Sequence, residues 1–288
     1  MASRLAGTAL VGLACLTAES ASAGRAPEFP HTVRWTIHDR GTIVVPVMIG
    51  RAGPFRMLPD TGSTRSAISS RVAARLKAPI TGGTLMVTPT GSAPRPVALL
   101  PALQIGSQFI SGVSAMVLPD KALPHGAQID GLIGQDVLAN HAYTLDYEAR
   151  ALRWHDDTRG VSGIRLRLAL SNGLFFVAAN GSGLRNGMHL LADSGADALV
   201  VFEPESRVSA RPDALATGVL RTSTGSRLGR EMVVEALELG TITLRKIRAL
   251  ILPDASGHAM LGDGLLPLHL FARVTVDGPG RTLIVHTR

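Results

Sequence analysis

The order of apolar and polar positions along the chain predicts many short strands. Apolar and β-branched runs bounded by Gly, Asn or Ser occur at 41–49 (GTIVVPVMI), 173–180 (GLFFVAAN) and 189–194 (HLLADS). Residues 274–285 (VTVDGPGRTLIV) have the strand–turn–strand pattern of a hairpin. Residues 69–76 (SSRVAARL) begin with serine and favour a short helix. These patterns together predict an all-β protein with little helix.

The chain also contains an internal repeat. Three pairs of segments match at one identical spacing: 87–92 (VTPTGS) with 221–226 (RTSTGS), 103–106 (LQIG) with 237–240 (LELG), and 117–120 (VLPD) with 251–254 (ILPD). Asp60 in MLPDTGSTRSAI and Asp193 in LLADSGADALVVF are separated by almost the same length of chain. Matches in the same order at nearly constant spacing indicate duplication of one structural unit.

A polar stretch at 155–163 (HDDTRGVSG) separates the two copies. We therefore expect an N-terminal lobe over residues 24–157 and a C-terminal lobe over 158–288, each of ordinary domain size. Within this stretch, His155 lies beside Asp156 and Asp157, which we interpret as a polar loop and not a metal site.

Residues 1–23 have the pattern of a signal peptide. Arg4 precedes a short apolar stretch, Leu5 to Ala18, and Ala21-Ser22-Ala23 is a cleavage pattern. This predicts a periplasmic or secreted protein; an uncleaved apolar anchor, or a lipoprotein modified at Cys15, are the alternatives. Cys15 is the one cysteine of the sequence, so the exported chain would contain no disulfide.

Composition limits the possible partners. Of the 288 residues, 45% are hydrophobic and 18% are charged, which is typical of a globular protein with a core. The net charge of +7 arises from scattered arginines, and aromatic residues are 4%, so we interpret the charge as a solvated surface and expect no nucleic-acid partner. The nine histidines have no zinc-binding spacing, and we expect neither metal nor cofactor.

The two aspartates indicate a specific chemistry. If the repeated units pack about a pseudo-twofold axis, Asp60 and Asp193 meet at that axis. Two carboxylates in contact cannot both ionise cheaply, so they share one proton. Such a pair is one base and one acid around one water, which suits hydrolysis of a peptide bond. We expect Asp60 to be the more easily ionised member of the pair.

The neighbouring residues have candidate supporting roles. Gly62 and Gly195 permit a tight turn that brings N–H groups to the carboxylates. We expect the hydroxyls of Thr61 and Ser194 to bond across the lobe interface. We expect the hydroxyl of Ser63 to donate to Asp60, a bond that its counterpart Ala196 cannot make.

These residues resemble the aspartic proteases of the pepsin/retropepsin family, and the bacterial exported members in particular. The resemblance rests on DTGS at 60–63 and DSGA at 193–196. It rests also on two apolar-apolar-Gly segments, LIG at 132–134 and MLG at 260–262. It implies two pseudo-symmetric, β-barrel-like lobes with the active-site cleft between them, each such segment passing behind one catalytic loop. It also implies an endopeptidase that acts on a peptide or protein substrate without a cofactor. With both lobes in one chain, we expect a monomer.

The resemblance further implies hairpin flaps over the cleft, with an ordinary exposed hairpin as the alternative at each position. The predicted flap and substrate-binding residues are Thr90, Gly91, Ser92, Thr224, Gly225 and Ser226. One departure from the family pattern is Pro59, which puts a residue without an N–H next to Asp60. An alternative function is therefore a non-catalytic peptide-binding protein whose aspartates Pro59 misaligns.

Overall fold

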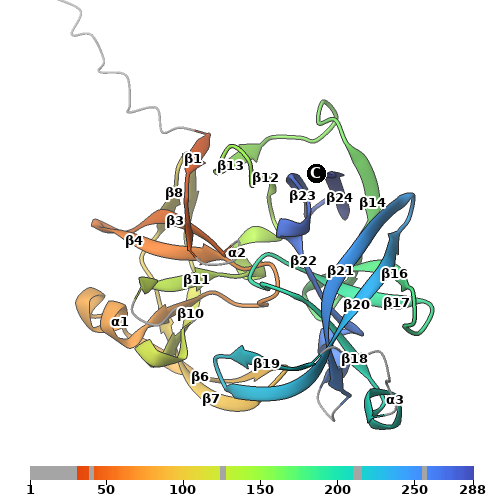
Figure 1. Cartoon of the computed structure of the whole chain (residues 1–288). Helices are drawn as coiled ribbons and strands as arrows, with labels where there is room; N and C mark the ends of the chain where they lie inside the picture. The colour runs from red at the N-terminus through yellow and green to blue at the C-terminus, as the bar shows by residue number, and fades with distance from the viewer. Residues whose placement is uncertain (1–30, 39–41, 124–127, 210–215, 255–257) are drawn as a thin grey trace, which may run out of the picture.

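The computed structural model describes residues 31–38, 42–123, 128–209, 216–254 and 258–288. The predicted signal peptide lies outside these residues. Strands make up 59% of the structure and helices 10%, in a two-lobed arrangement of three sheets, which confirms the all-β prediction (Figure 1). None of the described helices has the length and apolar character needed to span a bilayer.

The first half of the chain supplies thirteen strands. They are β1 (Thr32–Arg34), β2 (Thr36–His38), β3 (Thr42–Ile49), β4 (Ala52–Pro59), β5 (Ala67–Ser69), β6 (Ile80–Thr88), β7 (Gly91–Leu99), β8 (Leu103–Ile105), β9 (Gln108–Ile110), β10 (Ser114–Leu118), β11 (Gly131–Ile133), β12 (Ala142–Asp146) and β13 (Ala151–His155). Nine of them form one sheet in the order β6-β7-β10-β5-β11-β4-β3-β8-β9, and β2 pairs with β3.

The second half supplies eleven strands. They are β14 (Ile164–Arg167), β15 (Ala169–Ser171), β16 (Leu174–Gly181), β17 (Met188–Asp193), β18 (Leu199–Glu203), β19 (Ala216–Thr222), β20 (Gly225–Leu239), β21 (Ile242–Pro253), β22 (Gly264–Pro267), β23 (Arg273–Asp277) and β24 (Thr282–His286). Eight of them form a second sheet in the order β15-β16-β17-β22-β18-β21-β20-β19.

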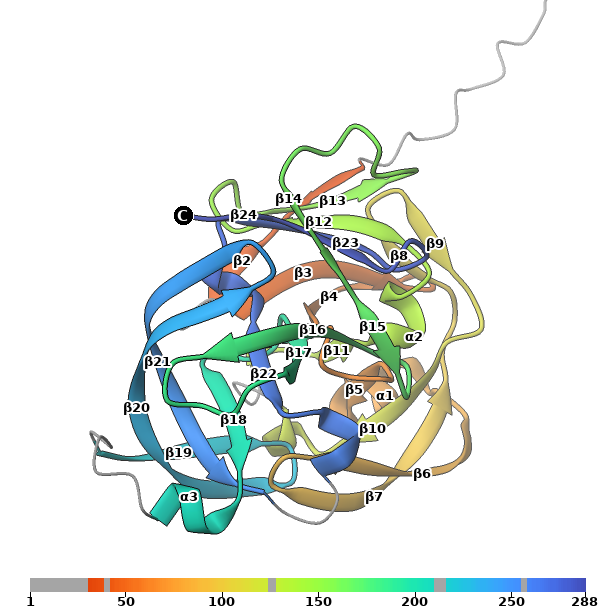
Figure 2. The ribbon, with the colours of Figure 1, turned by 90° about the vertical axis from the view of Figure 1, so that its right-hand side faces the viewer.

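A third sheet joins the two halves. Its order is β1-β13-β12-β23-β24-β14, so β12 of the first half pairs directly with β23 of the second. At their centre, the hydroxyls of Thr144 and Thr275 lie 2.6 Å apart in a hydrogen bond. Figures 1 and 2 both show this sheet on one side of the molecule and the hairpins β6–β7 and β19–β20 on the opposite side. The same sheet therefore fixes the position of one half relative to the other.

The core continues through all three sheets. One cluster of buried side chains includes Val45 of the first sheet, Val201 of the second, and Tyr143 and Val274 of the joining sheet. Smaller apolar clusters, which include Leu132 in the first half and Leu265 in the second, lie toward the hairpins. Burial in both halves thus depends on the joining sheet.

Helices are few and short, as the sequence pattern indicates. The α-helices are α1 (Ser70–Leu76), α2 (Gln135–Leu138) and α3 (Glu205–Ser209), and 3-10 turns occur at Asp120–Ala122, His258–Leu261 and Leu268–Leu270. The predicted helix at 69–76 is α1, and the side chain of Ser69 caps it by accepting from the N–H of Val72 at 3.1 Å.

One strand in each half lies behind the loop that carries its aspartate. β11 pairs parallel to β4 and antiparallel to β5, and β22 pairs parallel to β17 and antiparallel to β18. The prediction that the MLG segment at 260–262 has this role in the second half was wrong. Strand β22 has the sequence GLLP, and Pro267 stands where Gly134 stands in the first half.

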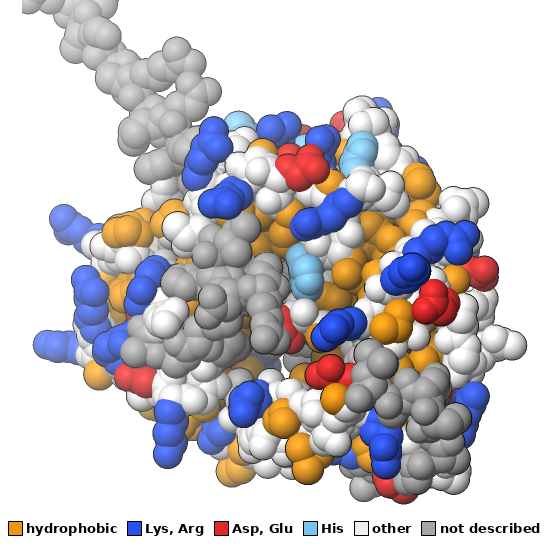
Figure 3. Space-filling model, in the orientation of Figure 1, with side chains coloured by type: hydrophobic (Ala, Val, Ile, Leu, Met, Phe, Trp, Pro, Cys, Tyr) orange, Lys and Arg blue, Asp and Glu red, His pale blue; other side chains and the backbone are white. Residues whose placement is uncertain are grey.

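The space-filling view shows how the basic residues are distributed on one face. Lys and Arg side chains are spread across it among neutral and apolar groups, without forming one continuous patch (Figure 3). This distribution agrees with the interpretation of the positive net charge as a solvated surface.

We predict that Gly131→Ala destabilises the fold by about 1–3 kcal/mol because its new methyl would overpack the core. A Cβ on Gly131 would collide with the backbone oxygen of Ala67. Gly82→Ala is the control, because a Cβ there meets nothing within 4 Å. Urea denaturation of both variants measures the difference, and equal midpoints would contradict the packing that we describe.

Candidate active site

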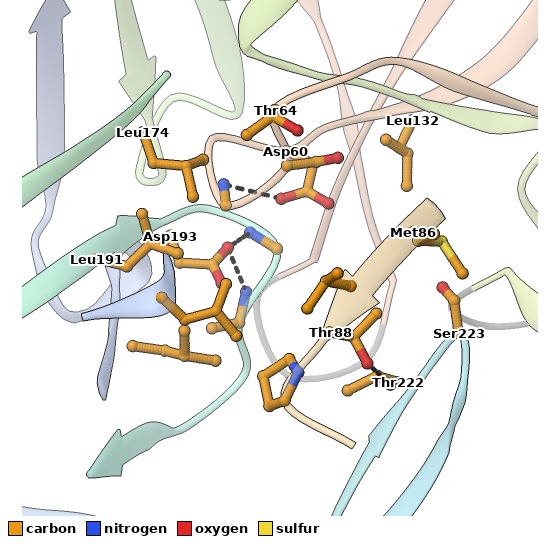
Figure 4. A pocket seen from close by; sticks show the side chains of 18 of the residues that line it. Asp60, Thr64, Met86, Thr88, Leu132, Leu174, Leu191, Asp193, Thr222 and Ser223 are labelled. Carbon is orange, nitrogen blue, oxygen red and sulfur yellow. Dashed lines mark hydrogen bonds between the residues drawn. The ribbon is translucent and has the colours of Figure 1, made fainter. Parts of the chain in front are cut away.

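The two aspartates lie at the ends of corresponding strands. Asp60 follows β4 directly and Asp193 is the last residue of β17. Figure 4 shows both carboxylates at one cavity, each close to the loop that carries it. Asp193 is buried at 8% exposure, and Asp60 is partly exposed. The structure thus brings together the two residues that the repeat places at equivalent positions.

Hydroxyls tie the two loops to each other beneath the carboxylates. The Thr61 hydroxyl donates to the carbonyl of Ala192 at 2.7 Å and accepts from the N–H of Ser194 at 2.9 Å. The Ser194 hydroxyl donates to the carbonyl of Pro59 at 2.7 Å and accepts from the N–H of Thr61 at 3.0 Å. These are the contacts expected of Thr61 and Ser194. All four bonds cross between the halves, and they are buried.

Each loop glycine lies against the carboxylate of the other half. A Cβ on Gly62 would be 2.5 Å from Cγ of Asp193. A Cβ on Gly195 would be 2.9 Å from Oδ1 of Asp60 and 3.3 Å from Oδ1 of Asp193. A side chain at either position would therefore occupy the space in which the two carboxylates meet.

Pro59 is accommodated without displacing the first loop. It is the last residue of β4, with Ile133 as its partner in β11, and its carbonyl is the acceptor for Ser194. The next N–H, that of Asp60, donates to the carbonyl of Ile133 at 2.8 Å. The carbonyl of Pro59 and the N–H of Asp60 are thus both hydrogen-bonded, and the misalignment considered for Pro59 is absent from this structure.

Each carboxylate accepts hydrogen bonds from N–H groups of its own loop. Oδ1 of Asp193 accepts from the N–H groups of Gly195 at 2.7 Å and Ala196 at 3.1 Å. Asp60 accepts from Gly62, at 3.0 Å to Oδ1, and from Ser63. Burial and the charge of Asp193 raise the pKa of Asp60 to about 8, against the effect of its two donors. Burial also raises the pKa of Asp193, to about 6, against the effect of its own two donors.

Both raised pKa values belong to one interacting pair, so the expected order of ionisation stays a prediction. The expected role of Ser63 was wrong, because its hydroxyl donates to the carbonyl of Arg65 at 2.8 Å. Ala196, which was expected to contribute nothing through its side chain, supplies the backbone donor that favours the ionised form of Asp193.

Sequence reasoning missed the residues that support the first loop from behind. The amide of Gln135 donates to the carbonyl of Thr61 at 2.9 Å. The Ser66 hydroxyl accepts from the N–H of Gly134 at 3.0 Å and donates to Asp136 at 2.8 Å. The sequence signal for this support was Gln135 and Asp136, the two polar residues directly after LIG, which begin the short helix α2.

The second loop lacks this support for a chemical reason. Pro267, in the place of Gly134, has no N–H that would need an acceptor. Leu199, at the spacing of the repeat from Ser66, has no hydroxyl to offer one. The two changes are complementary, so the second half loses a donor and its acceptor together.

The two predicted flap segments are hairpin tips that meet. Four threonine hydroxyls form a closed ring with successive oxygen–oxygen distances of 2.8 Å (Thr88–Thr222), 2.5 Å (Thr222–Thr90), 2.8 Å (Thr90–Thr224) and 2.5 Å (Thr224–Thr88). Each hydroxyl can donate one proton and also accept, so the ring satisfies all four. Arg227 of β20 adds a bond across the tips, to the carbonyl of Pro89 at 3.3 Å.

A cavity of about 270 Å³ lies between the hairpins and the aspartates. Most of its side chains are apolar: Met86, Met116, Leu118 and Leu132 from the first half, and Leu174, Leu191, Leu220, Leu261 and Leu265 from the second. The hairpins contribute residues 84–89 and 220–223. The predicted substrate-binding residues Thr90, Gly91, Ser92, Thr224, Gly225 and Ser226 lie beyond this lining, at the tips.

The described residues include no group of three or more His, Cys, Asp or Glu side chains that could hold a metal ion. The described side chains of the cavity present two carboxyl groups that share a proton beside apolar walls.

We predict that the folded state becomes less stable as pH rises, because the aspartate pair then gives up protons that it holds more tightly in the folded state. Both folded-state pKa values exceed the ordinary value of about 4, so the pair's contribution is complete below about pH 4. It is lost as pH passes through about 6 and about 8. In Asp60→Asn, the urea midpoint should change less over this range than in the unmodified protein.

The control for this measurement is Asp156→Asn, which alters an exposed carboxylate and should keep the pH dependence of the unmodified protein. An Asp60→Asn variant with the same pH dependence as the unmodified protein would contradict a raised pKa for Asp60.

We predict that the double variant Thr90→Val with Thr224→Val loosens the hairpin tips, because it removes two of the four ring hydroxyls and keeps the side-chain shape. Amide hydrogen exchange at Gly91 and Gly225 should accelerate by about fivefold or more, since each lost hydrogen bond is worth about 1 kcal/mol. Thr217→Val, an exposed change on β19 outside the ring, should leave that exchange unchanged. Equal exchange in both variants would argue against a closing role for the ring.

Comparison with known proteins agrees with this geometry. The family model for aspartyl protease matches residues 45–137 and 177–267, one segment in each half and more than half of the chain in total. The two segments contain Asp60 and Asp193 respectively. No curated protein matches the chain. The match identifies this chain as a member of the aspartyl protease family.

Proposed function

We propose that the protein is an aspartic endopeptidase in which Asp60 and Asp193 together activate a water molecule. The observation that carries the proposal is the meeting of two carboxyl groups with raised pKa values beneath paired hairpins. The family match supports a protease-type function and hence a peptide substrate. A buried carboxyl pair without a task would be costly to maintain.

The shared proton gives the two carboxyls complementary roles. The ionised carboxyl is the general base and takes a proton from the water as the water oxygen attacks the peptide carbonyl carbon. The protonated carboxyl is the general acid and donates its proton to the carbonyl oxygen. When the tetrahedral intermediate collapses, one of its hydroxyls returns a proton to the carboxyl that acted as the acid, and the other carboxyl protonates the nitrogen as the C–N bond breaks. The pair thus ends the reaction with one shared proton.

The cavity suits an extended peptide between the hairpins and the loops. Strands at a hairpin edge pair with a peptide main chain, while side-chain pockets provide the selection. The walls are apolar on both sides of the aspartates, and this supports a substrate with apolar side chains near the cut bond. The hairpins must part to admit it, because the threonine ring joins their tips.

The expected export belongs to the same proposal. A signal peptide over residues 1–23 would place the enzyme in the periplasm or outside the cell. Both aspartates come from one chain, which supports a monomer as the active unit.

We predict that the purified protein cleaves a mixed peptide library, and that a statine-type transition-state mimic blocks cleavage. Asp60→Asn and Asp193→Asn should each abolish turnover, because either change removes the acid–base pair. Activity should be greatest between about pH 6 and about pH 8, where the pair holds one proton.

Mass spectrometry of the digest measures both the cleavage and its pH dependence. Peptide binding without turnover at any pH, retained in both variants, would replace this proposal with the peptide-binding alternative. Turnover that survives either substitution would contradict the assigned mechanism.

A further inference from the structure

A second cavity lies on the joining sheet, on the side away from the core. Its volume is about 360 Å³. Its walls are Thr144 and Asp146 of β12, Ala151, Arg153 and His155 of β13, Arg273 of β23, and Asp157 with residues 160–162 of the connecting loop. Tyr143 and Leu145 of β12 alternate with the lining residues and point into the core. This cavity is therefore separate from the one that holds the aspartates.

The loop that covers this cavity is fixed in place. The hydroxyl of Thr158 donates to Asp277 of β23 at 2.7 Å, and Arg165 of β14 donates to the carbonyl of Thr158 at 2.7 Å. At the far end of the loop, Nε2 of His286 donates to the carbonyl of Ser162 at 2.8 Å. Bonds to three different strands hold the loop, so the cavity does not depend on a ligand for its shape.

The lining contains two arginines, Arg153 and Arg273, and two aspartates, Asp146 and Asp157. Arg273 pairs with Asp146 at 3.3 Å, and Asp157 pairs with Arg159, outside the lining, at 2.8 Å. Arg153 makes no ion pair with any residue in the described part of the chain, so its guanidinium is available to a ligand.

An uncharged donor, His155, lies near Arg153. Thr144 is the direct partner of Arg153 across the β12–β13 pair, and the Thr144 hydroxyl lies 2.7 Å from Nε2 of His155. Burial, and then the charge of Arg153, lower the pKa of His155, which keeps the ring neutral at neutral pH. A neutral ring that accepts from Thr144 through Nε2 carries its proton on Nδ1, where it can donate to a ligand.

We propose that this cavity binds a small oxyanion, a carboxylate or a phosphate group, with Arg153 as its principal partner. The planar guanidinium matches two oxygens of either group, and a half-enclosed site strengthens such charge-assisted bonds. The cavity is large enough for a small organic anion as well as an inorganic one. Because its walls come from both halves, a bound anion would connect β13 to β23 and stabilise the joining sheet.

The test is titration of the purified protein with inorganic phosphate and, separately, with acetate. Calorimetry measures the affinity, and nitrogen-edited NMR reports which amides respond. We expect saturable binding of at least one anion, with shifts confined to Arg153, His155 and residues 160–162. The anion that binds more tightly shows whether the natural ligand carries a phosphate or a carboxylate group.

Arg153→Gln should weaken this binding by about tenfold or more, as expected for loss of a charged hydrogen bond. The matched control is Arg167→Gln, which removes an exposed arginine on the same sheet outside the cavity. Arg153 is itself exposed, so its substitution should leave the thermal unfolding of the free protein unchanged. Absence of saturable binding for both anions, or equal weakening by the two substitutions, would overturn the proposal. Neither outcome depends on peptide cleavage.

Discussion

The structure depends on the burial of two like-charged groups at one point. Two carboxylates placed together in a poorly solvated site repel each other strongly, and the pair is tolerable only when one member keeps its proton. Rigid loops must hold the pair together against this repulsion. The four buried hydrogen bonds made by Thr61 and Ser194 supply that rigidity, and each of them links one half of the chain to the other.

Duplication explains why the loops meet, and divergence explains why they differ. Equivalent strands, β4 and β17, deliver equivalent residues to the axis, while different neighbours set the affinity of each carboxyl for its proton. Backbone donors reach both carboxyls, from Gly195 and Ala196 to Asp193 and from Gly62 and Ser63 to Asp60. The loops differ in their support, because Ser66 binds the N–H of Gly134 behind the first loop, and Pro267 stands in the place of that glycine behind the second.

Much of this arrangement is readable from the sequence because the repeat carries it. The alternating apolar runs predicted the strands, and the equal spacing of the DTGS and DSGA motifs predicted that Asp60 and Asp193 meet. The raised pKa values of the two carboxyls were not readable, since they depend on burial and on the N–H groups that reach each carboxylate after folding. The MLG assignment failed because the strand behind the second loop, β22, has the sequence GLLP, in which proline replaces the glycine of the motif.

Contacts between residues far apart in the sequence escaped prediction for a similar reason. The threonine ring needs two hairpin tips to arrive at one place, and each tip alone has the pattern of an ordinary turn. Gln135 and Ser66 support the first loop through bonds that join distant parts of the first half of the chain. Local pattern does not encode such contacts.

The strands beneath the two hairpins differ in length. Strand β20 continues for 15 residues from Gly225 at the tip to the buried Leu239, paired along its course with β19, β21 and β16. The first hairpin has strands of nine residues and a shift of register between Ile80 and Gly82 near its base. Even so, β21 begins to pair with β20 at Arg230 and β10 with β7 at Val97, so both tips project a similar distance beyond the sheet that supports them.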